Sequence, residues 1–177
     1  CTGLTTIPAD LFRYNTAVTT TAFQSTFNAC AGLTAIPTDL FRYNTAVTTS
    51  AFSGTFAGCS SITAIPADLF RYNTLLTTGA FNTLFSSCTG LTSLPADLFR
   101  YNVGLTSNAF SDTFWNCSNL TAIPIDFFKY NTAVSTVAFG GTFGKTGITI
   151  IPADLFRYNT LASGFTGTFN GCRSLSE

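Results

Sequence analysis

Cysteines recur along the chain every 29 residues up to Cys117, and the series resumes at Cys172 after one unit without a cysteine. The thiol is the most reactive kind of side chain in the protein. The series consists of Cys1, Cys30, Cys59, Cys88, Cys117 and Cys172. Each thiol can be a small buried apolar group at a tight turn. Neighbouring thiols can also form disulfides, although stacked units with parallel side chains hold the Cβ atoms too far apart for an easy bond. Zinc binding needs closer spacings, so we expect buried thiols and no metal.

Aspartate and a basic residue form a second recurring pair, three positions apart. The pairs are Asp10/Arg13, Asp39/Arg42, Asp68/Arg71, Asp97/Arg100, Asp126/Lys129 and Asp154/Arg157. Stacked units would turn them into a ribbon of ion pairs that sets the register, although exposed pairs contribute only ~0–1 kcal/mol each. The alternative is a solvated polar edge. Calcium binding or acid–base catalysis is not expected, because Glu177 is the only glutamate and no loop is dense in ligands.

The residue inventory argues against an enzyme. The chain has no histidine and no glycine-rich phosphate loop, so a general base, a triad and a nucleotide site all lack their usual residues. Eight basic residues balance eight acidic ones, which leaves no field for nucleic acid. No apolar run approaches the ~18 residues of a membrane span. We expect no catalytic residue, no cofactor, no nucleic acid and no membrane insertion.

These residues recur because the whole chain repeats about every 29 residues. The predicted domain organisation is one solenoid of six units, 1–29, 30–58, 59–87, 88–116, 117–145 and 146–171, with residues 172–177 starting a seventh. An asparagine recurs at one position of every unit: Asn15, Asn44, Asn73, Asn102, Asn131 and Asn159. A buried amide can bond the backbone of the next turn, so we expect an asparagine ladder beside the cysteine ladder.

Local signals within one unit predict three short elements. Leu4–Ile7 alternates apolar with polar residues before a proline, which predicts a strand. Pro8–Tyr14 has the proline, acidic and basic positions of a short helix. Phe23, Phe27 and Cys30 share one helical face, which predicts a second helical segment. The predicted fold class is therefore an α/β repeat solenoid, with short parallel strands on one side and short helices on the other.

One stretch of the repeat also resembles a known family. The run Phe56–Pro66, followed by Phe70, Asn73-Thr74 and Phe81, resembles the F-x-G-C-x-S-L-T-x-I repeat of BspA-like leucine-rich-repeat proteins, and it is similar to Mycoplasma-lipoprotein-type surface repeats. The resemblance implies a leucine-rich-repeat-like solenoid. It also implies a bacterial or phage-borne surface protein that adheres to or displays something.

Three functions remain open on the sequence. The first is an extracellular structural or adhesive scaffold, on a cell or virion surface, that binds a protein or glycan through positions that vary between units; Trp115, the only tryptophan, and Asp112 mark a possible binding face. The second is a filament subunit that binds copies of itself end to end, because the run from Cys172 restarts the unit and neither end has a polar cap. Ice binding through rows of threonine is a minor alternative.

Overall fold

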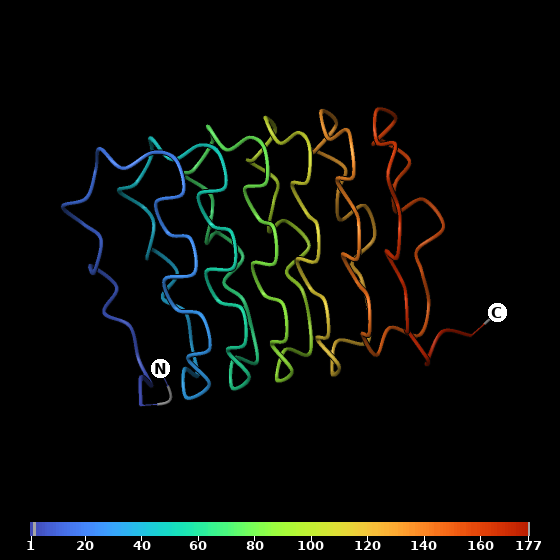
Figure 1. Cartoon of the computed structure of the whole chain (residues 1–177), viewed down its shortest axis with the longest axis horizontal. Coiled ribbons are helices and arrows are strands. Elements are labelled where there is room, and N and C mark those ends of the chain that lie inside the picture. Colours follow the sequence, from blue (N-terminus) through green and yellow to red (C-terminus); the bar gives the residue numbers. More distant parts are fainter. Residues whose placement is uncertain (2, 177) are drawn as a thin grey trace.

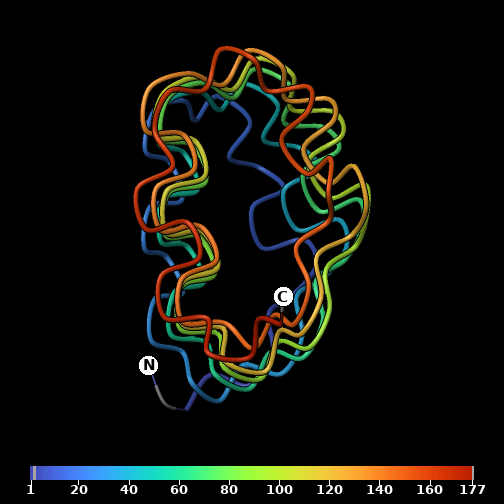
Figure 2. The ribbon, with the colours of Figure 1, turned by 90° about the vertical axis from the view of Figure 1, so that its right-hand side faces the viewer.

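A computed structural model of the chain describes residues 1 and 3–176. The backbone winds into a stack of coils that lie side by side from the N-terminal to the C-terminal end (Figure 1). Viewed along the stack, successive coils superpose into one closed oval outline, with one flank that undulates regularly (Figure 2). The chain is therefore a solenoid in which equivalent positions of successive units form columns along the axis.

The predicted helices and strands are wrong. In the part of the chain that the structure describes, no residue belongs to a helix or a strand, so the predicted α/β class does not hold. No helix in that part could cross a membrane either. In the predicted helix Pro8–Tyr14, Leu11 N–H bonds Pro8 O at 3.1 Å and Arg13 N–H bonds Asp10 O at 3.0 Å. These are turn bonds at every second residue, whereas an α-helix bonds each residue to the fourth before it.

The second predicted helical segment is a ribbon of overlapping turns. Thr21, Ser25 and Ala29 have φ values of 53°, 54° and 55°, a left-handed conformation that neither a helix nor a strand contains. Thr26 N–H closes a turn on Phe23 O at 3.3 Å. The Phe23 N–H instead points along the axis to the next coil. Left-handed residues four positions apart thus reproduce the spacing that suggested a helix.

Backbone hydrogen bonds along the axis join the coils through this ribbon. Phe23 N–H donates to Ala51 O at 2.8 Å, and Phe52 N–H donates to Ala80 O at 3.0 Å. Alternate residues make these bonds between coils, and the residues between them close turns within a coil. Every backbone N–H from Phe23 to Cys30 is therefore used without a regular ladder, as buried backbone groups require.

The predicted parallel sheet is also absent from the described residues, for a reason visible in Leu33–Ile36. Leu33 and Ile36 are buried, but Thr34 and Ala35 are both exposed, so the side chains do not alternate between two faces as in a strand. One backbone bond, Thr34 N–H to Thr5 O at 3.4 Å, joins this segment to the previous coil. A single bond of this kind does not make a ladder.

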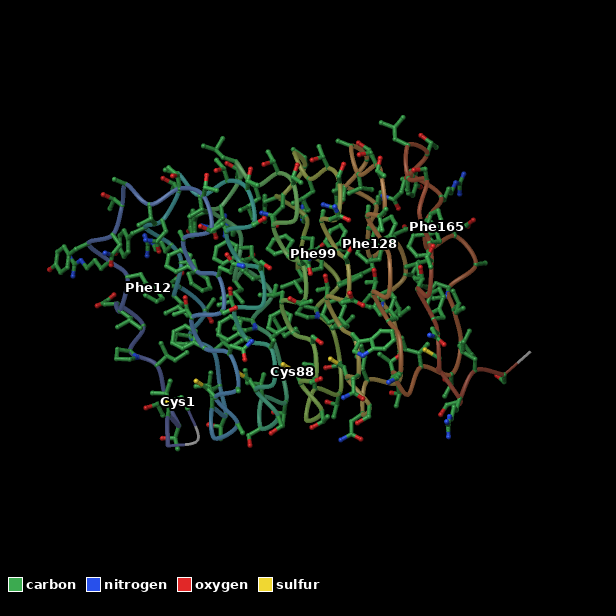
Figure 3. All side chains as sticks on the ribbon, viewed as in Figure 1. Cys1, Phe12, Cys88, Phe99, Phe128 and Phe165 are labelled. Carbon is green, nitrogen blue, oxygen red and sulfur yellow. The ribbon has the colours of Figure 1, made fainter. Side chains whose placement is uncertain are left out.

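Phenylalanine fills the interior of the stack in three columns. The ring centroids of Phe41 and Phe70 lie 6.1 Å apart in nearly parallel planes, while Phe70 and Phe81 meet at 4.7 Å with tilted rings. Such offset and tilted pairs add to the area they bury. Figure 3 shows Phe12, Phe99, Phe128 and Phe165 following one another along the stack. A continuous aromatic core therefore runs through all the coils.

Candidate functional site

The most distinctive surface carries most of the charged residues of the chain, and we call it the charged edge. It consists of three parallel columns: Asp10, Asp39, Asp68, Asp97, Asp126 and Asp154; Arg13, Arg42, Arg71, Arg100, Lys129 and Arg157; Tyr14, Tyr43, Tyr72, Tyr101, Tyr130 and Tyr158. All three columns come from the turns that follow the recurring proline. Their register along the axis is set by the core and the bonds between coils.

Each basic side chain of the charged edge before the last coil lies between two tyrosine rings. The Arg71 guanidinium carbon is 5.6 Å from the ring centroid of Tyr72 in its own coil and 5.6 Å from that of Tyr101 in the next. Lys129 stands at 5.7 Å and 5.9 Å from Tyr130 and Tyr158. A cation–π contact at an exposed site contributes ~0.5–1 kcal/mol. Basic side chains and tyrosine rings therefore alternate along the axis and order one another.

The aspartates of the charged edge make only long ion pairs. Within the described residues, three pairs come within 4 Å: Asp68/Arg71 at 3.9 Å, Asp97/Arg100 at 3.8 Å and Asp154/Arg157 at 3.8 Å. Each pair lies inside one coil, and the Asp97 side chain is 58% exposed. The carboxylates therefore keep oxygens free for a partner in solvent.

The structure places Trp115 and Asp112 against the next coil. A methyl group at Gly144 would collide with the Trp115 ring, and one at Gly141 would collide with the Asp112 carboxylate. Lys145 Nζ lies 5.1 Å from the Trp115 ring centroid. Partial burial raises the pKa of the Asp112 carboxyl. The indole thus packs between glycine and lysine of the next coil, which leaves little of it free as a platform for a ligand.

We expect Gly144→Ala to destabilise the chain by about 1–3 kcal/mol, because the added methyl group overpacks the Trp115 contact. The free energy of unfolding in urea measures the effect. Adding Trp115→Ser should recover most of the loss, since a serine leaves room for the methyl group. Gly3→Ala is the matched control, because nothing lies within 4 Å of its added methyl group. Equal losses at Gly3 and Gly144 would contradict the packing described.

The cysteine column lies inside the wall of the solenoid. Cys30, Cys59, Cys88 and Cys117 are buried, Cys1 is exposed, Cys172 is half-buried, and all six are free thiols. Cys88 Sγ donates to Phe56 O at 3.1 Å, and Cys59 and Cys117 make the same bond. Thr146 fills the one gap, with its Oγ1 3.2 Å from Cys172 Sγ. No group of three or more possible metal ligands occurs among the described residues.

Burial suppresses ionisation of these thiols. It raises the pKa of Cys59 to about 11 and that of Cys117 to about 12, and it raises the pKa of Cys88 well above its usual value. Because the thiolate is the reactive form, we expect iodoacetamide at mildly alkaline pH to modify exposed Cys1 and to spare these three thiols. Peptide mass spectrometry of native and urea-unfolded protein measures this. Modification of Cys88 as fast as Cys1 in the native protein would contradict it.

The asparagine column is buried in every coil but the first. Asn102 Nδ2 donates to Phe70 O at 3.1 Å and to Asn73 O at 3.0 Å. The equivalent amides, Asn44, Asn73, Asn131 and Asn159, make the same pair of bonds. Asn15 is exposed and makes no such bond among the described residues. The amide thus bonds the preceding coil.

A threonine column was missed at the sequence level. Thr113 Oγ1 donates to Phe81 O of the preceding coil at 2.8 Å, and Thr55, Thr142 and Thr168 make the equivalent bond. The recurring Thr-Phe dipeptide was the available signal. Leu84 takes the same place in the third coil and is fully buried, so one apolar substitution is tolerated in the column.

No protein-family model matches the chain, and no curated protein matches it. Among solved structures, it resembles a chain of the Drosophila Toll–Spatzle complex, with 21% identity, a TM-score of 0.49 and coverage of 89% of this chain and 21% of that one. It also resembles the glycosylated form of that complex, with 20% identity, a TM-score of 0.46 and coverage of 85% and 20%.

A leucine-rich-repeat protein from Bacteroides ovatus is similar as well, with 18% identity, a TM-score of 0.26 and coverage of 73% of this chain and 40% of that one. The chain spans about a fifth of the length of the Toll-complex chains. The similar structures thus include one leucine-rich-repeat protein, and none of these matches is specific to BspA-like proteins.

Proposed function

We propose that the chain is an extracellular structural or adhesive repeat scaffold of a bacterial surface protein or phage fibre. In this proposal the charged edge is its interaction surface, and the partner is a protein or a glycan on another surface, or a further copy of the chain. No catalytic step, cofactor, nucleic acid or membrane insertion is part of the proposal.

The charged edge carries the proposal, because its composition is that of a binding surface. Tyrosine and arginine are the residues enriched at protein interfaces and at their hot spots. Tyr43 and Tyr72 are 38% and 39% exposed, and their rings are held in place by the basic side chains on either side. Such an array meets a partner with little loss of side-chain freedom. A place outside the cell is supported by the resemblance of Phe56–Pro66 to bacterial surface repeats.

The test is binding of the fluorescently labelled chain to arrays of glycans and extracellular proteins. We expect hits that are lost in the double variant Tyr72→Ala, Tyr101→Ala, which opens the charged edge in its middle. Leu75→Ala is the control, because Leu75 is 56% exposed and lies outside the charged edge. An absence of hits for the unmodified chain, or equal loss in both variants, would contradict an adhesive role.

A filament formed by end-to-end stacking is the alternative proposal, and it requires a local rearrangement where two copies meet. Leu175 and Ser176 occupy the place of Leu4 and Thr5 in the repeat, and Ser176 N–H already bonds Thr149 O at 3.1 Å. A second copy that continued the stack in phase would put its own Leu4 and Thr5 at the same place. Stacking would therefore require one of the two segments to move away.

Ice binding remains a second candidate because of one observation. Each threonine of the row Thr5, Thr34, Thr63, Thr92, Thr121 and Thr149 is exposed together with the residue after it, and several of these neighbours are alanine or serine. The apolar residue two positions on, such as Ile36, is buried instead. Thermal hysteresis tests this candidate: a value that falls in Thr63→Tyr, Thr92→Tyr would support it, and no hysteresis in the unmodified chain would dismiss it.

A further inference from the structure

We propose that two copies of this chain pair side by side through their charged edges, related by a two-fold axis parallel to the solenoid axis. The inference rests on the proposed function, in that it takes the charged edge as the interaction surface and names the partner as a second copy.

The aspartate column and the basic column run parallel along the axis, three residues apart within each coil. Contacts such as Arg42 to Tyr72 at 5.8 Å and Arg100 to Tyr130 at 5.5 Å link the edge side chains of one coil to those of the next. The edge therefore presents one negative stripe and, beside it, one positive stripe. Both stripes extend over all six coils.

Two stripes of opposite charge are self-complementary in only one of the two side-by-side orientations. Rotation of a second copy by a half turn about an axis parallel to the stripes lays its negative stripe on the positive stripe of the first copy. Rotation about an axis across the stripes lays like charge on like charge, which is unfavourable. Because a two-fold interface uses the same patch on both subunits, the parallel arrangement is the one that this edge fits.

The charges on the edge are available for such pairing. The ion pairs within a coil are long, and the Arg100 and Asp97 side chains remain 47% and 58% exposed. Arg13, Arg42 and Lys129 have no carboxylate within 4 Å among the described residues. One exposed pair contributes little, but the repeat presents the same pair in every coil. Ion pairs between the two copies, each weak alone, then form intramolecularly once the first pair has formed.

Sedimentation velocity of the full chain across a concentration series tests the pairing. We expect a monomer–dimer equilibrium whose association constant falls at high salt, because salt screens exposed charges. The triple variant Arg42→Asp, Arg71→Asp, Arg100→Asp makes both stripes negative in the middle coils. It should lose about tenfold or more in association constant.

A charge-swapped variant separates the loss of charge complementarity from misfolding of the triple variant. Adding Asp39→Arg, Asp68→Arg and Asp97→Arg to the triple variant exchanges the two stripes and restores self-complementarity, so dimerisation should return. Far-ultraviolet circular dichroism confirms folding of each variant. A chain that stays monomeric at every concentration, or a dimer that is indifferent to salt and to the triple variant, would overturn the inference.

The orientation is tested separately with spin labels on the exposed thiol of Cys1 in a Cys172→Ser background. The parallel dimer brings the two labels together at one end, whereas an antiparallel dimer separates them by the length of the stack. Antiparallel labels would overturn the inference. If a strictly monomeric chain gives array hits, the proposed function holds and the pairing inference fails. If the chain forms a salt-sensitive dimer but gives no array hits, pairing is supported and adhesion to another surface is not.

Discussion

Replacing Phe99 with alanine is expected to destabilise the chain by about 3–5 kcal/mol, the range seen for large-to-small changes at aromatic core positions. Phe99 is fully buried, and its ring lies 4.8 Å from both Phe81 and Phe110 and 5.5 Å from Phe127. Truncation leaves a cavity in the middle of the aromatic core, which neighbouring coils cannot fill because their own positions are fixed by bonds between coils. Urea unfolding followed by circular dichroism measures the loss.

The same change in the first coil provides a matched control. Phe12 occupies the equivalent position but is only half-buried, and coil neighbours pack on one side of it alone. Phe12→Ala should therefore cost clearly less than Phe99→Ala. A solenoid whose coils contribute through contacts with their neighbours predicts this difference. Equal losses at the two positions would count against the stacked core.

Replacing Asn102 with leucine is expected to destabilise the chain by roughly 2–4 kcal/mol. The change removes the two bonds that Asn102 Nδ2 donates. Phe70 O keeps a bond from the Asn73 N–H at 3.1 Å, but Asn73 O is left without a donor, and a buried acceptor without a partner costs ~1–3 kcal/mol. Asn102 Oδ1 is buried and has no hydrogen-bond partner among the described residues, so its removal recovers part of this cost. The free energy of unfolding in urea measures the net effect.

Asn15→Leu is the control for the asparagine column, because Asn15 is exposed and no described coil precedes it. We expect it to change the free energy of unfolding by a few tenths of a kcal/mol, as is usual for surface substitutions. Should Asn15→Leu cost as much as Asn102→Leu, the two amide bonds between coils would not be the source of the effect.

The repeat period and the residues that form columns could be taken from the sequence, because stacking needs only that equivalent residues recur. The local conformation could not. The spacing of Phe23 and Phe27 fits a helix, yet left-handed residues at Thr21, Ser25 and Ala29 have the same four-residue period. None of these three is glycine, but equivalent positions of later coils, such as Gly54, Gly58 and Gly79, are glycines with positive φ and were the available signal. Bonds to the next coil favour the turn ribbon, and they are invisible in a single unit.

The candidate site was predictable in its residue types but not in its contacts. The fixed order of arginine and tyrosine was plain, whereas the reach of Arg71 to Tyr101 in the next coil depends on how the coils stack. Trp115 stood out as the only tryptophan. The signal that it packs against the next coil was the pair Gly141 and Gly144, since each stands 29 residues after a large side chain and offers room for it.

Backbone hydrogen bonds from alternate residues to the next coil hold the coils together, without helices or strands in the described residues. Scalar couplings through hydrogen bonds, measured by nuclear magnetic resonance on isotope-labelled chain, test this arrangement directly. The structure predicts couplings from Phe81 N–H to the Ala109 carbonyl and from Thr83 N–H to the Ser111 carbonyl. Couplings from Phe85 N–H to the Phe81 carbonyl, as in an α-helix, would contradict it.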